Sequence, residues 1–178
     1  MTRCIALLRG INVGRARRLA MADLRRIVLD LGASEVATVL NSGNVVMTAP
    51  RSRVATLASA MSAALAGHSG FEVPVVVVTA DELDAVIAAN TLVEATQVPD
   101  RLLVAFASAS RALAPARVLL ERDWTPEALT LARRAAYLWC AEGVLASRLL
   151  PAFTRATGGV ATARNWSTVL KLQRLARG

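Results

Sequence analysis

The sequence predicts an α+β protein with two ferredoxin-like (βαββαβ-type) subdomains, in which antiparallel sheets pack against helices. Two observations support this fold class. Short β-rich apolar runs alternate with stretches of helical apolar spacing over residues 3–79, in the order βαββαβ. The rest of the chain repeats the theme more loosely, without an exact sequence repeat. We expect an N-terminal subdomain at residues 1–79 and a C-terminal subdomain at residues 80–178, together forming one compact unit.

The N-terminal subdomain is predicted from apolar spacing and turn residues. Gly32 follows the first helical stretch as a stop, and Asn41–Asn44 is a good turn because Asn and Gly tolerate positive φ. The expected elements are a strand at Arg3–Arg9, a helix at Met21–Leu31, strands at Val36–Leu40 and Val45–Thr48, a helix at Val54–Leu65 and a strand at Val73–Val78.

The C-terminal subdomain is expected to open with a helix, because Thr79–Glu82 has the pattern of a capping box. The elements expected after this first helix, which runs through Ile87, are a loop at Asn90–Asp100, a strand at Leu102–Ala107, a helix at Ala112–Glu121, a hairpin of Leu129–Ala132 with Ala136–Cys140, a short helix at Leu145–Phe153, an extended piece at Val160–Ala163 and a last helix capped by Asn165 or Ser167.

Composition narrows the function classes. No apolar run reaches the roughly 18 residues that a membrane-spanning helix needs, and the first residues do not form a secretory signal, so we expect a cytoplasmic protein without a membrane partner. Cys4 and Cys140 are isolated in apolar segments and are expected to be buried. His68, the only histidine, is expected in a loop. A catalytic triad, a metal site and a cofactor are therefore not expected.

The chain is strongly basic, with a net charge of +8. Arg15, Arg17 and Arg18 cluster before the first predicted helix, and Arg25 and Arg26 follow on it. A basic surface attracts phosphates and nucleic acid. The same cluster is also compatible with an ordinary solvated face.

The segment Arg9–Gly14 leaves the end of the first predicted strand. Gly10 and Gly14 let backbone amides approach a ligand closely, and Arg9 beside them adds a positive charge, so the segment suits an anion. The alternative is a glycine-rich turn in which Asn12 bonds its own backbone.

The segment Asn41–Asn44 carries an excess of amide groups. Asn41, Ser42 and Asn44 offer donors and acceptors to a polar ligand, although a hairpin turn explains the same residues without a function.

The third polar segment, Thr162–Leu172, combines several groups that recognise anions. Arg164 offers a rigid fork for carboxylate or phosphate, and Trp166 offers a face for stacking. Asn165 and Thr168 lie where a helix begins, and Lys171 is the only lysine of the chain. The alternative is a capped helix with Trp166 as a core anchor.

Four motifs resemble the bacterial family called domain of unknown function 1697: ALLRGINVG at residues 6–14, MADLR at 21–25, SGNVV at 42–46 and ARNWSTVLKL at 163–172. Gly143 and Ser147 resemble a further weak motif, with Arg148 in place of a lysine. The resemblance implies two ferredoxin-like subdomains and no established activity. The residues expected to bind a ligand are Arg9, Gly10, Asn12, Gly14, Asn41, Ser42, Asn44, Arg164, Asn165, Trp166, Thr168 and Lys171.

The function predicted from these residues is binding of a phosphate-bearing or other anionic ligand, either a nucleotide or a nucleic acid, at the junction of the two subdomains. In this prediction Asn12, Asn44 and Arg164 converge in space. Two alternatives remain open. One is a small-molecule enzyme that uses Arg164, Lys171 and backbone amides, and the other is a structural or protein-interaction role.

Overall fold

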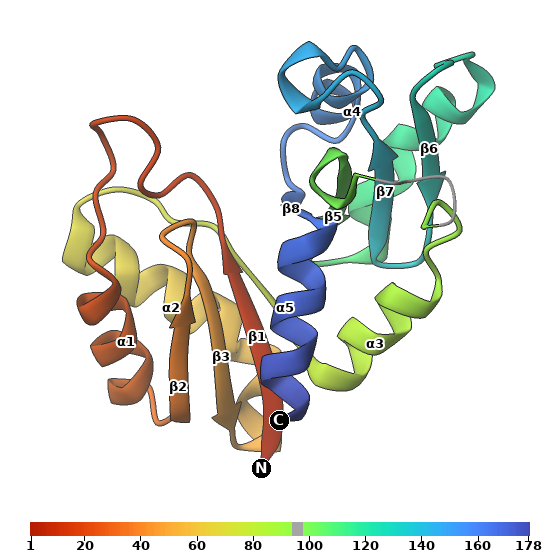
Figure 1. Ribbon diagram of the computed structural model, residues 1–178. Coiled ribbons are helices and arrows are strands. Elements are labelled where there is room, and N and C mark those ends of the chain that lie inside the picture. Colours follow the sequence, from red (N-terminus) through yellow and green to blue (C-terminus); the bar gives the residue numbers. More distant parts are fainter. Residues whose placement is uncertain (94–97) are drawn as a thin grey trace. The chain divides into compact units, whose positions relative to one another are not determined.

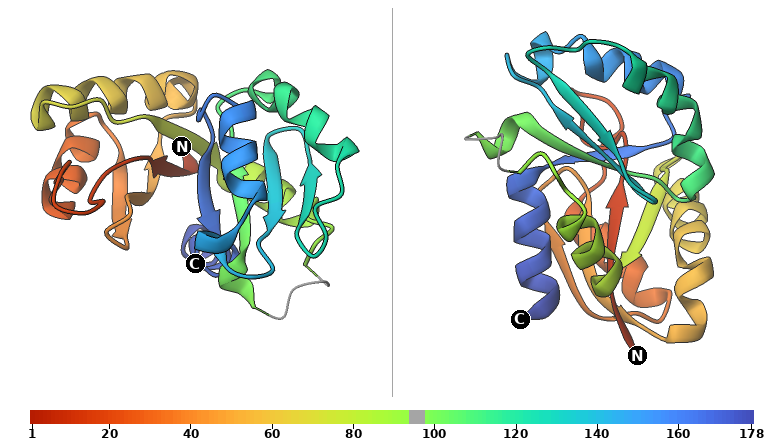
Figure 2. Two further views of the ribbon diagram at one scale, coloured as in Figure 1. Left: turned by 90° about the horizontal axis from the view of Figure 1, so that it is seen from above. Right: turned by 90° about the vertical axis from the view of Figure 1, so that its right-hand side faces the viewer.

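A computed structural model of the chain describes residues 1–93 and 98–178 (Figure 1). Close backbone contacts divide the chain into two compact units. Unit 1 comprises Met1–Leu83 and Leu172–Gly178, and unit 2 comprises Asp84–Lys171. The path of the chain through each unit can be followed in two further views (Figure 2). The division predicted after Thr79 stays a prediction.

Unit 1 contains a four-stranded antiparallel sheet in the order β2-β3-β1-β4. Two helices, α1 and α2, pack on one face of this sheet (Figure 1). The elements are β1 (Thr2–Leu8), α1 (Met21–Asp30), β2 (Ser34–Val39), β3 (Asn44–Ala49), the 3₁₀ turn η1 (Arg51–Arg53), α2 (Val54–Ser69), β4 (Val75–Thr79), the start of α3 (Ala80–Ala88) and the end of α5 (Trp166–Arg177).

Strand β1 is buried on both of its faces. Cys4, Ala6 and Leu8 belong to the core that α1 and α2 cover. The alternate residues Ile5 and Leu7 point to the other face and are also fully buried. This explains why β1 reads as a continuous apolar run rather than as an alternating one.

Unit 2 repeats the topology with a second antiparallel sheet, in the order β6-β7-β5-β8. The helical segments η3 and α4 pack on one face of it. The elements after α3 are the 3₁₀ turn η2 (Pro99–Arg101), β5 (Leu102–Phe106), the 3₁₀ helix η3 (Ser110–Glu121), β6 (Ala128–Leu131), β7 (Ala135–Trp139), the 3₁₀ turn η4 (Val144–Ala146), α4 (Leu149–Ala156), β8 (Thr162–Asn165) and the start of α5.

The predicted fold class is confirmed. Each sheet places the first strand of its βαββαβ set in the interior, between the third and the fourth, which is the ferredoxin-like order. The predicted capping box also forms at the start of α3. Glu82 N donates to Thr79 Oγ1 (3.1 Å), and Thr79 N donates to Glu82 Oε2 (2.9 Å).

Segment η3 differs from the predicted α-helix because it is a 3₁₀ helix throughout. Pro115 lies inside it and has no N–H for an α-helical bond. Its buried residues Leu113, Ala116 and Leu119 recur every third position. That spacing matches the three residues per turn of a 3₁₀ helix, so one apolar row faces the sheet.

Two further expectations were wrong in detail. The helix expected at Leu145–Phe153 is split into η4 and α4. His68 lies in the last turn of α2, where its Nε2 is 3.3 Å from Asp23 Oδ2, and not in a loop. Tyr137 is fully buried and donates to Val86 O (2.7 Å), so it is a packing residue.

The loop expected at Asn90–Asp100 lies partly outside the described residues, and its end forms η2. Within residues 1–93 and 98–178, no helix is long and apolar enough to cross a membrane. The same residues contain no group of three or more His, Cys, Asp or Glu side chains that could hold a metal ion.

The turn between β2 and β3 lies close against the end of β1. Gly43 is buried, has φ +83° and accepts a hydrogen bond at its carbonyl from Leu8 N (2.8 Å). A Cβ atom at Gly43 would lie 2.7 Å from Ile11 Cδ1 and 2.8 Å from Leu8 Cβ. Glycine is therefore required at this position both for its backbone conformation and for space.

We expect Gly43→Ala to lower the free energy of unfolding by about 2–4 kcal/mol, because left-handed strain adds to an overlap with Leu8 and Ile11. Gly70→Ala is the matched control, since Gly70 has φ +75° with no atom within 4 Å of a Cβ. Urea unfolding should show a loss of about 1 kcal/mol for the control. Equal losses for the two variants would show that the close approach does not matter.

Candidate functional site

The first two polar segments meet in unit 1. Asn12 Nδ2 donates to Leu19 O (3.0 Å) and to Asn41 O (2.9 Å), and Leu19 N donates to Asn12 Oδ1 (3.0 Å). One carboxamide therefore joins both ends of the β1–α1 loop and ties the loop to the β2–β3 turn. Asn12 has φ +54°, a conformation that Asn adopts more readily than most residues.

Asn44 is fully buried at the start of β3. Its Nδ2 donates to Val39 O (2.8 Å) and to Ser42 Oγ (3.1 Å). Val39 is also the ladder partner of Asn44, so the side chain closes the same turn that the backbone makes. Asn44 thus has the turn-forming role that the sequence offered as an alternative, whereas Asn12 bonds Leu19 and Asn41 rather than its own backbone. A ligand contact by either residue stays a prediction.

The remaining predicted residues of the first segment shape the β1–α1 loop. Gly10 and Gly14 have positive φ values of +72° and +61°. Arg9 is half-buried, and its backbone N–H donates to Pro74 O (3.0 Å). A Cβ at Gly10 would lie 3.3 Å from Arg17 Nη1, so this glycine leaves room for an arginine side chain.

The third segment lies in unit 2, where β8 leads directly into α5. Asn165 is the cap of α5, because its Oδ1 accepts from Thr168 N (3.0 Å). Trp166 and Thr168 are buried, and Trp166 is the core anchor of the alternative interpretation. The convergence of this segment with Asn12 and Asn44 stays a prediction.

Asp100 is a partner of this segment that the sequence did not reveal. Its Oδ1 accepts from Asn165 Nδ2 (2.9 Å) and from Ser167 Oγ (2.5 Å). The carboxylate therefore holds the side chains at the start of α5. No local pattern marks Asp100, because its partners lie 65 and 67 residues away in the chain.

Arg164 is the most desolvated arginine of the candidate set. Burial lowers the pKa of its guanidinium to about 10, so the group remains charged at neutral pH. Its Nη1 donates to Ala163 O (2.8 Å). Thr162 lies two residues earlier on β8, and alternation along a strand places the two side chains on the same face. Its side chain is 1% exposed, and Thr162 Oγ1 has no hydrogen-bond partner among the described residues.

Lys171 lies on the surface of α5 and is exposed. An amine that acts as a base or as a Schiff-base nucleophile at neutral pH needs burial or a neighbouring cation to lower its pKa. The exposure of Lys171 therefore gives no support to the enzymatic role that the sequence left open for it.

A second network, centred on Glu127, holds the start of α4. The buried Glu127 carboxylate accepts from Ser147 Oγ, from Arg148 N (3.0 Å) and from Leu149 N (3.1 Å). Leu150 N donates to Ser147 Oγ (2.9 Å), so Ser147 caps the same helix. This gives a structural role to Ser147, part of the weak motif noted in the sequence. Glu127 itself was missed because its partners lie 20 to 22 residues away.

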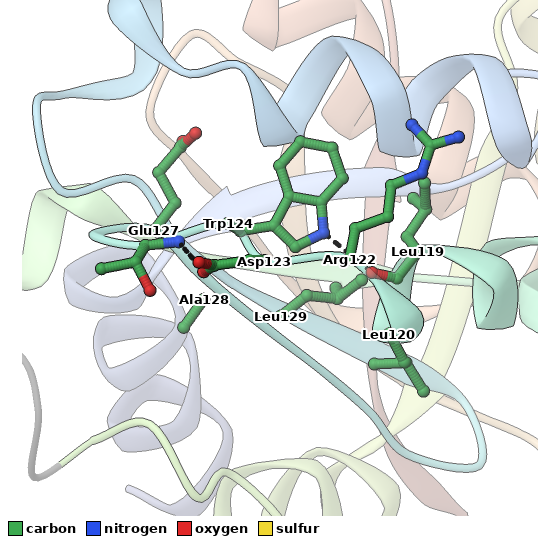
Figure 3. A pocket seen from close by; sticks show the side chains of 9 residues that line it. Leu119, Leu120, Arg122, Asp123, Trp124, Glu127, Ala128 and Leu129 are labelled. Carbon is green, nitrogen blue, oxygen red and sulfur yellow. Dashed lines mark hydrogen bonds between the residues drawn. The ribbon is translucent and has the colours of Figure 1, made fainter.

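A shallow pocket of about 230 Å³ lies beside this network (Figure 3). The Trp124 indole in its wall is fixed by a hydrogen bond from Nε1 to Leu119 O (2.8 Å). Asp123 is exposed, and hydrogen bonds from Thr125 hold the pKa of its carboxyl below the usual value. The volume is smaller than the roughly 300 Å³ at which typical small-molecule sites begin. We therefore do not assign the predicted ligand to this pocket.

Both cysteines are buried and free, as expected. Burial raises the pKa of the Cys4 thiol. Burial also raises the pKa of the Cys140 thiol, because its effect exceeds the lowering by the hydrogen bond with Ser147. Burial likewise raises the pKa of Tyr137 to about 12. These groups are neutral at physiological pH and lack the thiolate or phenolate character of a nucleophile.

A family model described as a protein of unknown function, DUF1697, matches residues 1–137. The chain belongs to this family. The matched range contains the first three motifs of the sequence analysis, while the fourth, at residues 163–172, lies beyond it. The family description carries no activity, so the function has to be argued from the chain's own residues.

The fold is also found in a solved structure, described as the conserved bacterial protein SP0830 from Streptococcus pneumoniae. The two share 23% sequence identity with a TM-score of 0.78, and the alignment covers 98% of each chain. At this identity the likeness shows the fold alone. No curated protein matches the sequence.

We expect Glu127→Gln to lower the free energy of unfolding by about 1–3 kcal/mol, because a neutral amide accepts more weakly than a carboxylate from the N–H groups of Arg148 and Leu149. Glu142→Gln makes the same chemical change at an exposed residue of unit 2 and should change stability little. Thermal and urea unfolding measure both. Equal stability of the two variants would show that the Glu127 carboxylate does not stabilise the start of α4.

We expect Cys4 and Cys140 to react slowly with an aromatic disulfide reagent at pH 8 in the folded protein, because the raised thiol pKa and burial both limit attack. Unfolding in urea should release two fast-reacting thiols per chain. The Cys4→Ser variant leaves Cys140 as the reacting thiol, so it separates the reaction rates of the two cysteines. A rapidly reacting thiol in the folded protein would contradict the buried assignment.

Proposed function

We propose that the protein binds a phosphate-bearing or other anionic ligand at β8 of unit 2, through Arg164 and Thr162. The observation that carries the proposal is the presence, on one face of one strand, of a partly desolvated guanidinium and of a buried hydroxyl that has no partner among residues 1–93 and 98–178. Both groups are hydrogen-bond donors, and an oxyanion accepts from donors of this kind.

The hydroxyl of Thr162 supports a ligand over a purely structural role. A buried hydroxyl without a hydrogen-bond partner destabilises the folded protein, and Thr162 Oγ1 has no partner among the described residues. A bound oxyanion would accept a hydrogen bond from this hydroxyl and offset that cost. Arg164 also suits the task because its charge persists at neutral pH and its planar fork matches phosphate geometry.

A structural role is the better assignment for the other two segments. The amides of Asn12 and Asn44 make hydrogen bonds inside unit 1, to Leu19, Asn41, Val39 and Ser42. The same predicted residue set thus divides into groups that hold turns and groups that we propose to hold an anion.

We expect Thr162→Val to raise the free energy of unfolding by about 1–2 kcal/mol while weakening ligand binding, because valine fills the same space and favours a strand without burying an unpaired hydroxyl. The readouts are urea unfolding without ligand and calorimetric titration with inorganic phosphate and adenosine monophosphate. Loss of stability without a change in affinity would reject the proposal and favour the structural alternative.

We expect Arg164→Met to abolish phosphate and nucleotide binding with little change in the melting temperature of the ligand-free protein. Arg155→Met is the matched control, because Arg155 is an exposed arginine of α4 in the same unit. The control should bind as the unchanged protein does. A melting temperature strongly lowered by Arg164→Met, together with unchanged binding, would refute the assignment.

A further inference from the structure

We propose that the loop between β1 and α1 in unit 1 is a second binding site, which takes the phosphate backbone of single-stranded nucleic acid. The tip of this loop, residues 13–18, is exposed throughout and carries Arg15, Arg17 and Arg18. Residues 9–20 contain four arginines and no aspartate or glutamate. The proposal concerns residues of unit 1 only and does not depend on the site proposed at Arg164.

Three other arginines of unit 1 are paired with carboxylates, whereas the loop tip gathers, within four residues, three arginines without a salt bridge to any described residue. Arg3 lies within 4 Å of the Glu35 carboxylate, and Arg177 lies within 4 Å of the Asp81 carboxylate. Arg26 lies within 4 Å of both Asp23 and Asp30. In the part of the chain that the structure describes, no salt bridge involves Arg15, Arg17 or Arg18. The loop tip therefore presents uncompensated positive charge, which complements a polyanion.

The loop is held in one shape before any ligand arrives. Asn12 N donates to Arg17 O (2.9 Å), and the Asn12 side chain ties Leu19 and Asn41 together. The Arg17 guanidinium carbon lies 5.7 Å from the centre of the Phe71 ring, which orients a second part of the tip. Preorganisation of this kind reduces the entropy lost on binding.

A single strand fits this tip better than a duplex does. Val13 is 70% exposed beside the arginines and offers an apolar contact to an unstacked base. Exposed guanidinium planes can stack on bases as well as bind phosphates. A duplex keeps its base faces stacked inside the helix, so it can use the charges of the tip but offers no unstacked base face to Val13.

The salt dependence of binding provides the quantitative test. Each phosphate neutralised on a single strand contributes about −0.7 to the slope of log K against log salt concentration. Three arginines therefore contribute about −2, which corresponds to an affinity change of about 16-fold between 50 and 200 mM salt.

The experiment measures fluorescence anisotropy of a labelled 20-nucleotide single strand between 50 and 200 mM salt. Arg15→Gln, Arg17→Gln and Arg18→Gln combined should reduce the steepness of the slope by about 2. The combined control, Arg111→Gln, Arg117→Gln and Arg133→Gln, removes the same charge from exposed positions of unit 2 and should leave the slope unchanged. Combined lysine substitutions at positions 15, 17 and 18 should retain the steep slope, because lysine keeps the charge.

Two results would overturn the proposal. One is an equal reduction of the slope by both glutamine combinations, which would assign binding to net charge rather than to the loop. The other is binding of a blunt duplex, or of phosphatidylglycerol vesicles, at least as tight as that of the single strand with the same dependence on Arg15, Arg17 and Arg18. Tighter single-strand binding that is lost only in the loop variant, with an unchanged melting temperature, supports it.

Discussion

The arrangement of the first polar segments depends on the close approach of the β2–β3 turn to the end of β1. Leu8 N bonds Gly43 O, and no atom beyond Cα fits at Gly43 beside Leu8 and Ile11. Because the turn lies this close, Asn41 O comes within reach of the Asn12 side chain. The absence of one carbon atom thus sets the position of a loop that begins more than thirty residues earlier in the chain.

The two units use asparagine amides alike but differ in how they place arginine. In unit 1 the amides of Asn12 and Asn44 are used inside the structure, and the guanidinium groups of the loop tip stay in water. In unit 2 Arg164 is half-buried and partly desolvated, and the amide of Asn165 is used at a helix start. A guanidinium at the surface keeps its hydration and does not destabilise the fold. A buried guanidinium is stable only where the groups that it contacts replace that hydration. The exposed arginines of the loop tip and the half-buried Arg164 therefore suggest different modes of binding.

The order of elements could be predicted because it depends on short-range patterns. Apolar periodicity and the pair Thr79 and Glu82 involve residues within one or two turns of each other. Asp100 and Glu127 could not be found in this way, since each carboxylate meets partners that only the fold brings near. The 3₁₀ character of η3 was detectable in principle, because Leu113, Ala116 and Leu119 recur at a spacing of three and not of 3.6. Of the candidate site, the turn role of Asn44 followed from residue chemistry, whereas the desolvation of Arg164 depends on packing that no local pattern encodes.

Unit 1 is discontinuous in sequence, because it combines residues 1–83 with residues 172–178. Arg3 Nη2 donates to Leu175 O (3.3 Å), and Arg177 pairs with Asp81 at 2.7 Å, so the late segment contacts some of the earliest residues. During synthesis, all of unit 2 leaves the ribosome before the segment that completes unit 1. The first sheet must therefore persist for that interval without its last helical segment, while the second unit already has all of its residues. Unit 1 is therefore the first to begin synthesis and the last to be completed.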